Sequence, residues 1–294
     1  MALDRTARKA MAEDVARDGV AGSIQRYVAV IGGAILAGIV MSWALGSMVS
    51  ERGVPGPLVI EAISPVRAVA TLALALLVAT AIGVLVGRIV NPAVGTFVVG
   101  VGLGVTALGS GSYTDALFSN GLGIGLPIET LAWGGVSLLV ALVLYRTTGP
   151  LPDQSERSPA EVLDPRTVFS SASLKAAAAG LLAVAVVFLF ASNDLRGQAL
   201  GAAVLAGWAT GHVGRVLAPR HQPVLLYAAP SVFMAAAQLV ATSTGTDGLV
   251  EAWTQGASPR FLVTSPIDLA AGALIGVSMG IGTSRGFVEQ HADD

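Results

Sequence analysis

The chain contains no cysteine and little charge, and its basic residues are almost all arginine. Without cysteine it has no disulfide, no thiolate nucleophile and no cysteine-ligated metal. Only 12% of its 294 residues are charged, about half of the roughly 25% usual in a soluble domain. Lys9 and Lys175 are the two lysines, and with abundant Ala, Gly and Val this composition favours a prokaryotic source. A net charge of −2 argues against a nucleic-acid partner.

Motifs of known catalytic and cofactor sites are missing as well. There is no P-loop, HExxH, CxxCH or dinucleotide fingerprint, so we expect no cofactor, no metal and no enzyme activity. One segment, 276–280, fits the hydrolase motif G-x-S-x-G around Ser278, with His212 predicted at a similar depth. That motif requires a strained strand-to-helix turn, whereas Ser278 is predicted within a helix, so we interpret its glycines as packing residues. The same close helix packing is predicted for glycines at four-residue spacing: 83/87, 100/104, 197/201, 207/211 and 272/276/280.

Apolar sequence is abundant: 53% of the residues are hydrophobic and the mean hydropathy is +0.72. Several runs reach the roughly 20 residues that cross a bilayer. They are continuous rather than alternating, which indicates helices and not a barrel. The sequence therefore predicts an all-α, polytopic membrane helix bundle. We expect eight spans, near 27–49, 66–90, 93–108, 128–145, 174–191, 197–217, 224–241 and 267–282.

The distribution of basic residues predicts the orientation. With the N-terminus inside, 13 of the 17 basic residues fall on the cytoplasmic side, and the outer side holds Arg52, Arg67, Arg196 and Arg260. Positive charge is typically enriched in cytoplasmic connections. Both termini are therefore predicted to be cytoplasmic, in a prokaryotic plasma membrane.

The spans fall into two groups of four. Residues 1–26 carry mixed charge and apolar residues at helical spacing, which predicts an amphipathic cytoplasmic segment. The first four spans occupy 27–145, a proline-rich cytoplasmic linker occupies 146–173, and the other four occupy 174–283, before a tail at 284–294.

Three short motifs recur in the same order in both groups. GRIVNP at 87–92 corresponds to GRVLAP at 214–219, TDAL at 114–117 to TDGL at 246–249, and PIE at 127–129 to PID at 266–268. This correspondence predicts two four-helix repeats, and because four is even, both enter the membrane in the same direction. It also makes Arg88 and Arg215 equivalent, so we expect Arg88→Ala and Arg215→Ala to have similar effects.

Each motif has a structural interpretation. The arginine lies at a helix end, and Pro92 begins the next helix. Thr114 and Thr246 are predicted to cap short outer helices at 114–119 and 246–255. The alternative is functional: Asp115 with Glu129, and Asp247 with Asp268, could form two outer acidic clusters that attract cations.

A few other polar residues lie within the predicted spans. Gln238 is away from a span end, and Pro230 could break the same helix, as in transporters whose broken helices line a cavity. His212 and Arg215 project from one face, where a gating role competes with headgroup contact. No Asp, Glu or Lys is predicted at mid-depth, which argues against coupling through a buried carboxylate.

Two functions follow from these residues. The first is a permease or channel-like protein that moves a small solute or ion between the two halves, near Arg88, His212, Arg215, Pro230 and Gln238. The alternative is a non-catalytic membrane scaffold or accessory subunit that binds a protein partner through 146–173 or the outer helices. A water-filled cavity between the halves would favour the first function, and a dry, packed interface would count against it.

Overall fold

The computed structural model describes residues 2–118, 123–154, 164–243 and 245–290. Residues 155–163 of the predicted linker, Ser119 at the end of the first predicted outer helix, and 291–294 of the tail lie outside them. The described chain is helical, with two isolated β-bridges in the 49–62 connection. The helices are α1 (Ala2–Ser42), α2 (Pro65–Ile89), α3 (Pro92–Gly109), α4 (Tyr113–Leu117), α5 (Gly125–Thr148), α7 (Pro165–Val168), α8 (Ser171–Ala177), α9 (Leu181–Phe190), α10 (Arg196–Leu217), α11 (Ala229–Thr242), α12 (Gly245–Thr254) and α13 (Pro266–Gln290). Short 3₁₀ turns are η1 (Trp43–Ser47), η2 (Val59–Glu61), η3 (Pro152–Gln154), η4 (Ala178–Gly180), η5 (Pro223–Tyr227) and η6 (Arg260–Leu262).

Six helical segments in the described residues are long and apolar enough to cross a membrane: 22–47, 65–89, 92–109, 125–148, 171–190 and 266–286. They match six of the eight predicted spans, and the membrane-bundle class follows. The other two predicted spans, 197–217 and 224–241, are not among these six segments. α10 has 22 residues but includes Arg196, His212 and Arg215, and α11 has only 14 residues, with Pro230 in its first turn. The break predicted at Pro230 is present, since η5 precedes α11.

The GRIVNP segment has the structure that its residue types indicate. Arg88 lies in the last turn of α2, and the helix ends at Ile89. Asn91 then caps α3, its side-chain oxygen accepting a hydrogen bond from the backbone N–H of Val94 at 3.0 Å, with Pro92 at the first position. An N-cap acceptor satisfies a backbone donor that the helix leaves free. This segment is therefore a helix end followed directly by a new helix.

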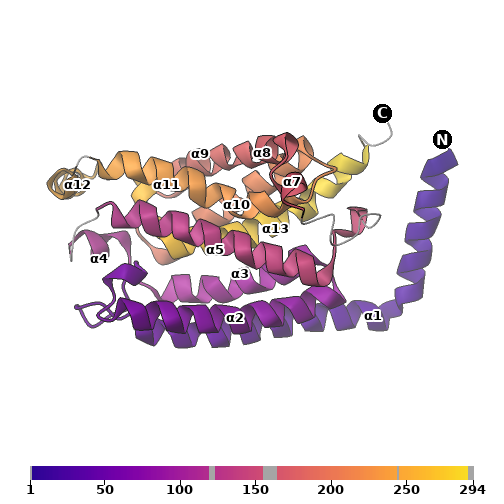
Figure 1. Cartoon of the computed structure of the whole chain (residues 1–294), viewed down its shortest axis with the longest axis horizontal. Helices are drawn as coiled ribbons and strands as arrows, with labels where there is room; N and C mark the ends of the chain where they lie inside the picture. The colour runs from indigo at the N-terminus through magenta and orange to yellow at the C-terminus, as the bar shows by residue number, and fades with distance from the viewer. Residues whose placement is uncertain (1, 119–122, 155–163, 244, 291–294) are drawn as a thin grey trace.

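The N-terminal part of α1 is set off from the rest by Gly19. Its φ of 52° and ψ of 174° interrupt the helix, a conformation that glycine adopts without steric cost. In Figure 1 the part before Gly19 turns across the bundle axis, while the part after it runs along the bundle. The predicted surface helix and first span are thus one helix with a kink, and the change of direction comes earlier than the predicted boundary at 26.

The closest packing in the bundle joins α10 and α13. A Cβ atom built on Gly276 would lie 2.1 Å from the carbonyl oxygen of Val204, and one on Gly280 would lie 2.4 Å from that of Trp208. Gly207 and Gly211 meet α13 equally closely. Glycine at four-residue spacing permits such backbone contact in membranes. Packing was predicted for these glycines and is confirmed.

The other predicted glycine pairs differ in how closely they pack against a neighbouring helix. A Cβ on Gly83 would lie 2.8 Å from the backbone of Gly95, so α2 and α3 are also in close contact. Gly197 and Gly201 have nothing within 4 Å of an added Cβ, so the packing predicted for that pair is wrong. Their outward-facing positions on α10 leave them open.

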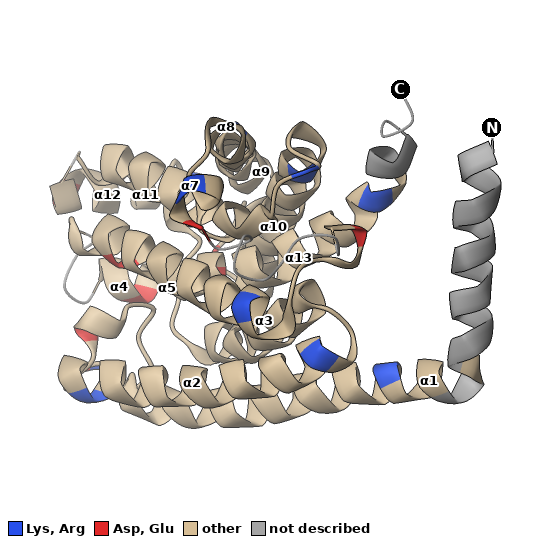
Figure 2. Ribbon diagram, turned by 45° about the vertical axis from the view of Figure 1, so that its right-hand side comes forward, with Lys and Arg blue, Asp and Glu red and all other residues tan. Residues whose placement is uncertain are grey.

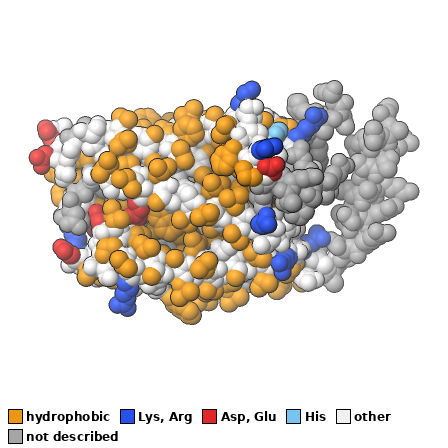
Figure 3. Space-filling model, in the orientation of Figure 1, with side chains coloured by type: hydrophobic (Ala, Val, Ile, Leu, Met, Phe, Trp, Pro, Cys, Tyr) orange, Lys and Arg blue, Asp and Glu red, His pale blue; other side chains and the backbone are white. Residues whose placement is uncertain are grey.

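The two ends of the bundle differ in charge. The beginning of α1 and the end of α13 lie at the same end (Figure 1). In Figure 2 the charged residues lie mainly at helix ends and in connections. In Figure 3 most of the visible Lys and Arg side chains lie toward the end that holds the termini, most Asp and Glu side chains lie toward the other, and apolar side chains cover the flank between them. This pattern is the one expected of a bilayer-spanning bundle.

Candidate functional site

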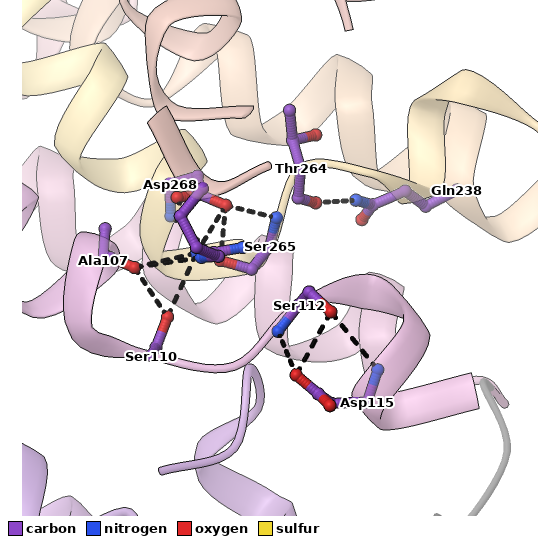
Figure 4. Close-up of polar contacts among 9 residues, drawn as sticks. Ala107, Ser110, Ser112, Asp115, Gln238, Thr264, Ser265 and Asp268 are labelled. Atoms are coloured by element: carbon purple, nitrogen blue, oxygen red, sulfur yellow. Dashed lines mark hydrogen bonds and ion pairs between the residues drawn. The ribbon is translucent and has the colours of Figure 1, made fainter. Parts of the chain in front are cut away.

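Asp268 is the centre of a buried polar cluster at the beginning of α13. Its side chain is 0% exposed and accepts hydrogen bonds from Arg196 Nη2 at 2.8 and 2.9 Å. The backbone N–H and hydroxyl of Ser265 both donate to Asp268 Oδ2 at 2.8 Å. Arg196 also donates to the carbonyl of Ala107 and to Ser110, so the cluster joins α3, α10 and α13. Figure 4 shows Asp268, Ser265, Ser110 and Ala107 converging.

Glu129 lies near the beginning of α5, at its fifth residue, because the helix begins at Gly125. It is 6% exposed, and its two carboxylate oxygens accept from the backbone N–H groups of Val59 at 2.9 Å and Ile60 at 3.2 Å. These hydrogen bonds link η2 to α5. Burial, and then the negative charge of Glu129, raise the pKa of the nearby Glu61 carboxyl to about 7.

The other two predicted acidic residues lie in different surroundings. Asp115 accepts from the backbone N–H of Ser112 at 2.7 Å, completing a capping box, and lies 3.5 Å from Arg52. Asp247 is exposed in the first turn of α12. Among the described residues, no group of three or more His, Asp and Glu side chains is arranged to hold a metal. The cation-binding role of these carboxylates stays a prediction.

The two short helices, α4 and α12, are close to their predicted ranges, but the caps differ. The N-cap of α4 is Ser112 rather than Thr114, and the Thr114 hydroxyl donates to Asp194 at 2.5 Å. Thr246 lies inside α12, which begins at Gly245. Both predicted threonine caps are wrong, because the helices start one or two residues earlier than the TDxL motif suggests.

Gln238 is fully buried, and both its amide oxygen and its amide nitrogen form hydrogen bonds. Its Oε1 accepts from the Thr130 hydroxyl at 2.6 Å, and its Nε2 donates to the carbonyls of Phe261 and Thr264, each at 3.2 Å. It therefore links α11 to α5 and to the η6 connection, and Figure 4 shows the bond to Thr264. The nearby Pro230 is buried at the start of α11. These contacts are structural in this conformation.

Arg88 and Arg215 have different surroundings despite their matching motifs. Arg88 is exposed at the end of α2. Arg215 is 2% exposed, pairs with Asp153 of η3 and donates to the carbonyl of His221 at 2.8 Å. The space beside Arg215 is only about 10 Å³, room for about one water molecule. Similar effects of the two alanine substitutions are thus no longer expected.

Ser278 and His212 have separate partners. The Ser278 hydroxyl donates to the carbonyl of Leu274 at 2.7 Å and lies 3.1 Å from the Tyr227 hydroxyl. His212 Nδ1 lies 3.1 Å from the hydroxyl of Thr283, which also accepts from Trp208 at 3.1 Å. Ser278 lies inside α13 without a nucleophile elbow, as predicted from its glycine neighbours.

Sequence reasoning missed a buried row of small and polar side chains on α5. Thr130, Ser137 and Tyr145 are each 0% exposed, and with Gly134 and Ala141 they repeat at spacings of three and four. Gly134 packs against Ser231 of α11, since a Cβ on it would lie 3.0 Å from Ser231 Cβ. Near the end of α5, the hydroxyls of Tyr145 and Tyr227 are 3.5 Å apart. The repeat of small and polar residues was the signal that could have revealed this face.

Two hydroxyls in this region lack partners. Those of Ser137 and Ser231 are buried and make no hydrogen bond within the described part of the chain. An unpaired buried polar group is costly and calls for a physical explanation.

Comparison with known proteins adds no constraint. No protein-family model matches the chain, and no curated protein or solved structure is similar to it. Similarity assigns it to no family. The residues themselves carry the functional argument.

Proposed function

We propose that this integral membrane protein is a non-catalytic scaffold or accessory subunit, embedded in a prokaryotic plasma membrane with both termini cytoplasmic. Six long apolar helices fit a multi-pass membrane protein. The observation that carries the proposal is the state of the predicted pathway residues. Gln238 and Arg215 are buried in structural contacts, and the space beside Arg215 holds about 10 Å³.

The contact between the two groups of helices is also close. A Cβ on Gly100 of α3 would lie 2.8 Å from the backbone nitrogen of Ile275 on α13. Carriers with repeated halves work by rocking one part against another. Backbone-level contact between α3 and α13, added to the hydrogen bonds from Arg196 of α10 to the carbonyl of Ala107 on α3, favours a fixed arrangement. A rigid body of this kind suits a scaffold.

We further propose that the chain consists of two parallel four-helix repeats. Glu129 and Asp268 support this proposal, since each is buried near the beginning of the fourth long helix of its group, Asp268 in the first turn of α13 and Glu129 at the fifth residue of α5. Both side chains bind the segment that precedes or begins the second helix of the same group: Glu129 binds η2 before α2, and Asp268 binds Arg196 at the start of α10. The different surroundings of Arg88 and Arg215 mean that the repeats have diverged at their cytoplasmic ends.

A permease is the second candidate, and one observation favours it. The unpartnered hydroxyls of Ser137 and Ser231 lie where α5 and α11, from different groups, meet. Polar side chains in a membrane interior commonly mark a solute or ion path. A closed conformation of such a path would place small hydroxyls between helices in this way.

Flux through the reconstituted protein separates the two candidates. We expect vesicles that contain the protein to show no more flux of small ions and solutes than protein-free vesicles. Flux that is lost in Ser137→Ala or Ser231→Ala, but kept in the matched variant Ser284→Ala, would contradict the scaffold and support the permease. The Ser284 hydroxyl is buried but bonded to the carbonyl of Ile281 at 2.9 Å.

A scaffold must also contact a partner. A photo-crosslinking residue at Trp253, which is 41% exposed on the outer helix α12, is expected to give one discrete protein adduct in native membranes. The same residue at Leu77, 68% exposed on the apolar flank of α2, is the control that reports lipid contact. No adduct at Trp253, at η3 or at α7 would count against a protein partner.

A further inference from the structure

A groove of about 500 Å³ lies between α2 and α5. Its walls are almost wholly apolar and include Val69, Leu72, Ile128 and Trp133. It is open to the side, since Ile128 is 59% exposed. Both helices are candidate membrane spans, so the medium at this opening is the hydrocarbon of the bilayer rather than water. The apolar walls and the membrane surroundings of this groove match an acyl chain in polarity.

The outer end of the groove is negatively charged. Glu129 lines it, and Glu61 directly follows the lining residue Ile60. The two oxygens of Glu129 accept hydrogen bonds from backbone N–H groups, whereas the half-buried Glu61 carboxylate receives no hydrogen bond from the described residues. Within the described ranges no lysine or arginine forms an ion pair with either carboxylate. A cation placed here would gain two negative neighbours without displacing a protein cation.

We infer that this groove binds one phospholipid that carries an ammonium headgroup, with one acyl chain between α2 and α5 and the ammonium beside Glu61. The apolar walls recognise the chain, and the carboxylates recognise the headgroup. Ammonium–carboxylate hydrogen bonds are among the stronger polar contacts. An anionic headgroup such as glycerol phosphate would bring its charge toward Glu61 and Glu129 and bind less well. The inference does not depend on whether the protein is a scaffold or a permease.

Trp133 makes the site measurable, because it lines the groove. The chain has four tryptophans, and replacing Trp43, Trp208 and Trp253 with Phe leaves Trp133 as the only indole. This variant is reconstituted in phosphatidylglycerol vesicles that contain a small fraction of either dibrominated phosphatidylethanolamine or dibrominated phosphatidylglycerol. Bromine on the acyl chain quenches tryptophan fluorescence on contact. We expect an apparent affinity for the ethanolamine lipid roughly fivefold higher, the effect of one charge-assisted hydrogen bond.

Two further variants test the two parts of the site. Glu61→Gln is expected to remove the headgroup preference while quenching at high bromolipid content remains. Ala73→Leu fills the groove, which Ala73 lines, and is expected to reduce quenching by both lipids. Ala70→Leu, on an exposed part of α2 outside the groove, is the matched control and should leave quenching unchanged.

Three outcomes would overturn the inference. Equal quenching by the two lipids would show that the groove does not select an ammonium group. A preference that survives Glu61→Gln would place the headgroup elsewhere. No quenching in the unaltered groove would show that protein, not lipid, fills it.

Discussion

The two motif arginines make opposite contributions at the scale of single residues. Arg215 is buried and paired with Asp153, whereas Arg88 is exposed at a helix end. We expect Arg215→Ala to lower the free energy of unfolding by about 3 kcal/mol, because it leaves the Asp153 carboxylate without its cation and removes one of the two donors to the His221 carbonyl. Arg88→Ala should change it by no more than about 0.5 kcal/mol. Thermal or denaturant unfolding in detergent measures both.

Asp153→Ala is the informative companion to these variants. If the ion pair stabilises the η3 connection, the loss in Asp153→Ala and the loss in Arg215→Ala should not add in the double variant. Equal effects of Arg88→Ala and Arg215→Ala would restore the functional equivalence that the motifs suggested and contradict the burial argument.

Glu61 gives the protein a pH-dependent stability. Its pKa is raised from 4.5 to about 7, first by burial and then by Glu129. Between these values the folded protein keeps a proton that the unfolded chain releases, so stability falls as pH rises through this window. Because Glu61 is only half-buried, the loss is on the order of 1 kcal/mol. Comparing unfolding of the wild type and Glu61→Gln at about pH 5 and about pH 8 checks it.

The sign of that change is the decisive result. The wild type should lose stability relative to Glu61→Gln at the higher pH. A wild type that gains stability relative to the variant on going to the higher pH would show that Glu61 is held in its charged form, by a cation that the described residues do not provide.

Residue roles set by local chemistry could be predicted from sequence. Pro92 begins a helix, Arg88 lies in the last turn of one, and Asp268 lies in a first turn, as their neighbours indicated. Glu129 does not, because α5 begins at Gly125 rather than at Pro127 and Glu129 is its fifth residue. Partners could not be predicted, because they come from distant segments. Glu129 binds a backbone 70 positions away in the chain, and one sequence contains no signal for that contact.

At the scale of helices, glycines decide how closely α10 and α13 pack. Gly276→Ala would place a methyl group 2.1 Å from the carbonyl oxygen of Val204. We expect it to lower the free energy of unfolding by about 1–3 kcal/mol through overpacking. Gly201→Ala, on α10 itself, has open space around the new methyl group and should be neutral or stabilising by up to about 1 kcal/mol.

Unfolding measurements of the two variants side by side test the contact. Since both add one methyl group to a helix, their difference isolates the contact with the neighbouring helix. Equal stability of the two variants would mean that α10 and α13 are not packed backbone to backbone.

Helix prediction succeeded where the helix is apolar by itself and weakened where it relies on a neighbour. The spans near 66–90 and 93–108 differ from α2 and α3 by one residue at each end. α10 was predicted as a span from its length, but it is not among the six strongly apolar helices. Its small and polar residues are accommodated by α13, and such pairing cannot be read from either helix alone.

For the whole molecule, the open question of six or eight crossings has a direct test. The chain has no native cysteine, so single cysteines can be introduced at exposed positions. With eight crossings, a membrane-impermeant maleimide added outside should label Glu51→Cys and Asp247→Cys, but neither Thr147→Cys nor Arg220→Cys. Labelling of Arg220→Cys from outside would mean that α10 and α11 do not cross. Labelling after permeabilisation is the control for accessibility.

The close packing of α10 against α13 also has a consequence for the biogenesis of the protein. The ribosome completes α10 before α13 exists, so for that interval the backbone at Gly207 and Gly211 has no α13 packed against it. The insertion machinery must retain α10, or shield it, until Pro266 and the residues after it have entered the membrane. Chains stopped before α13 should therefore be recognised as unfinished and degraded, and pulse–chase of chains ending before and after α13 measures this. Insertion of α13 is thus the step that covers the glycine face of α10.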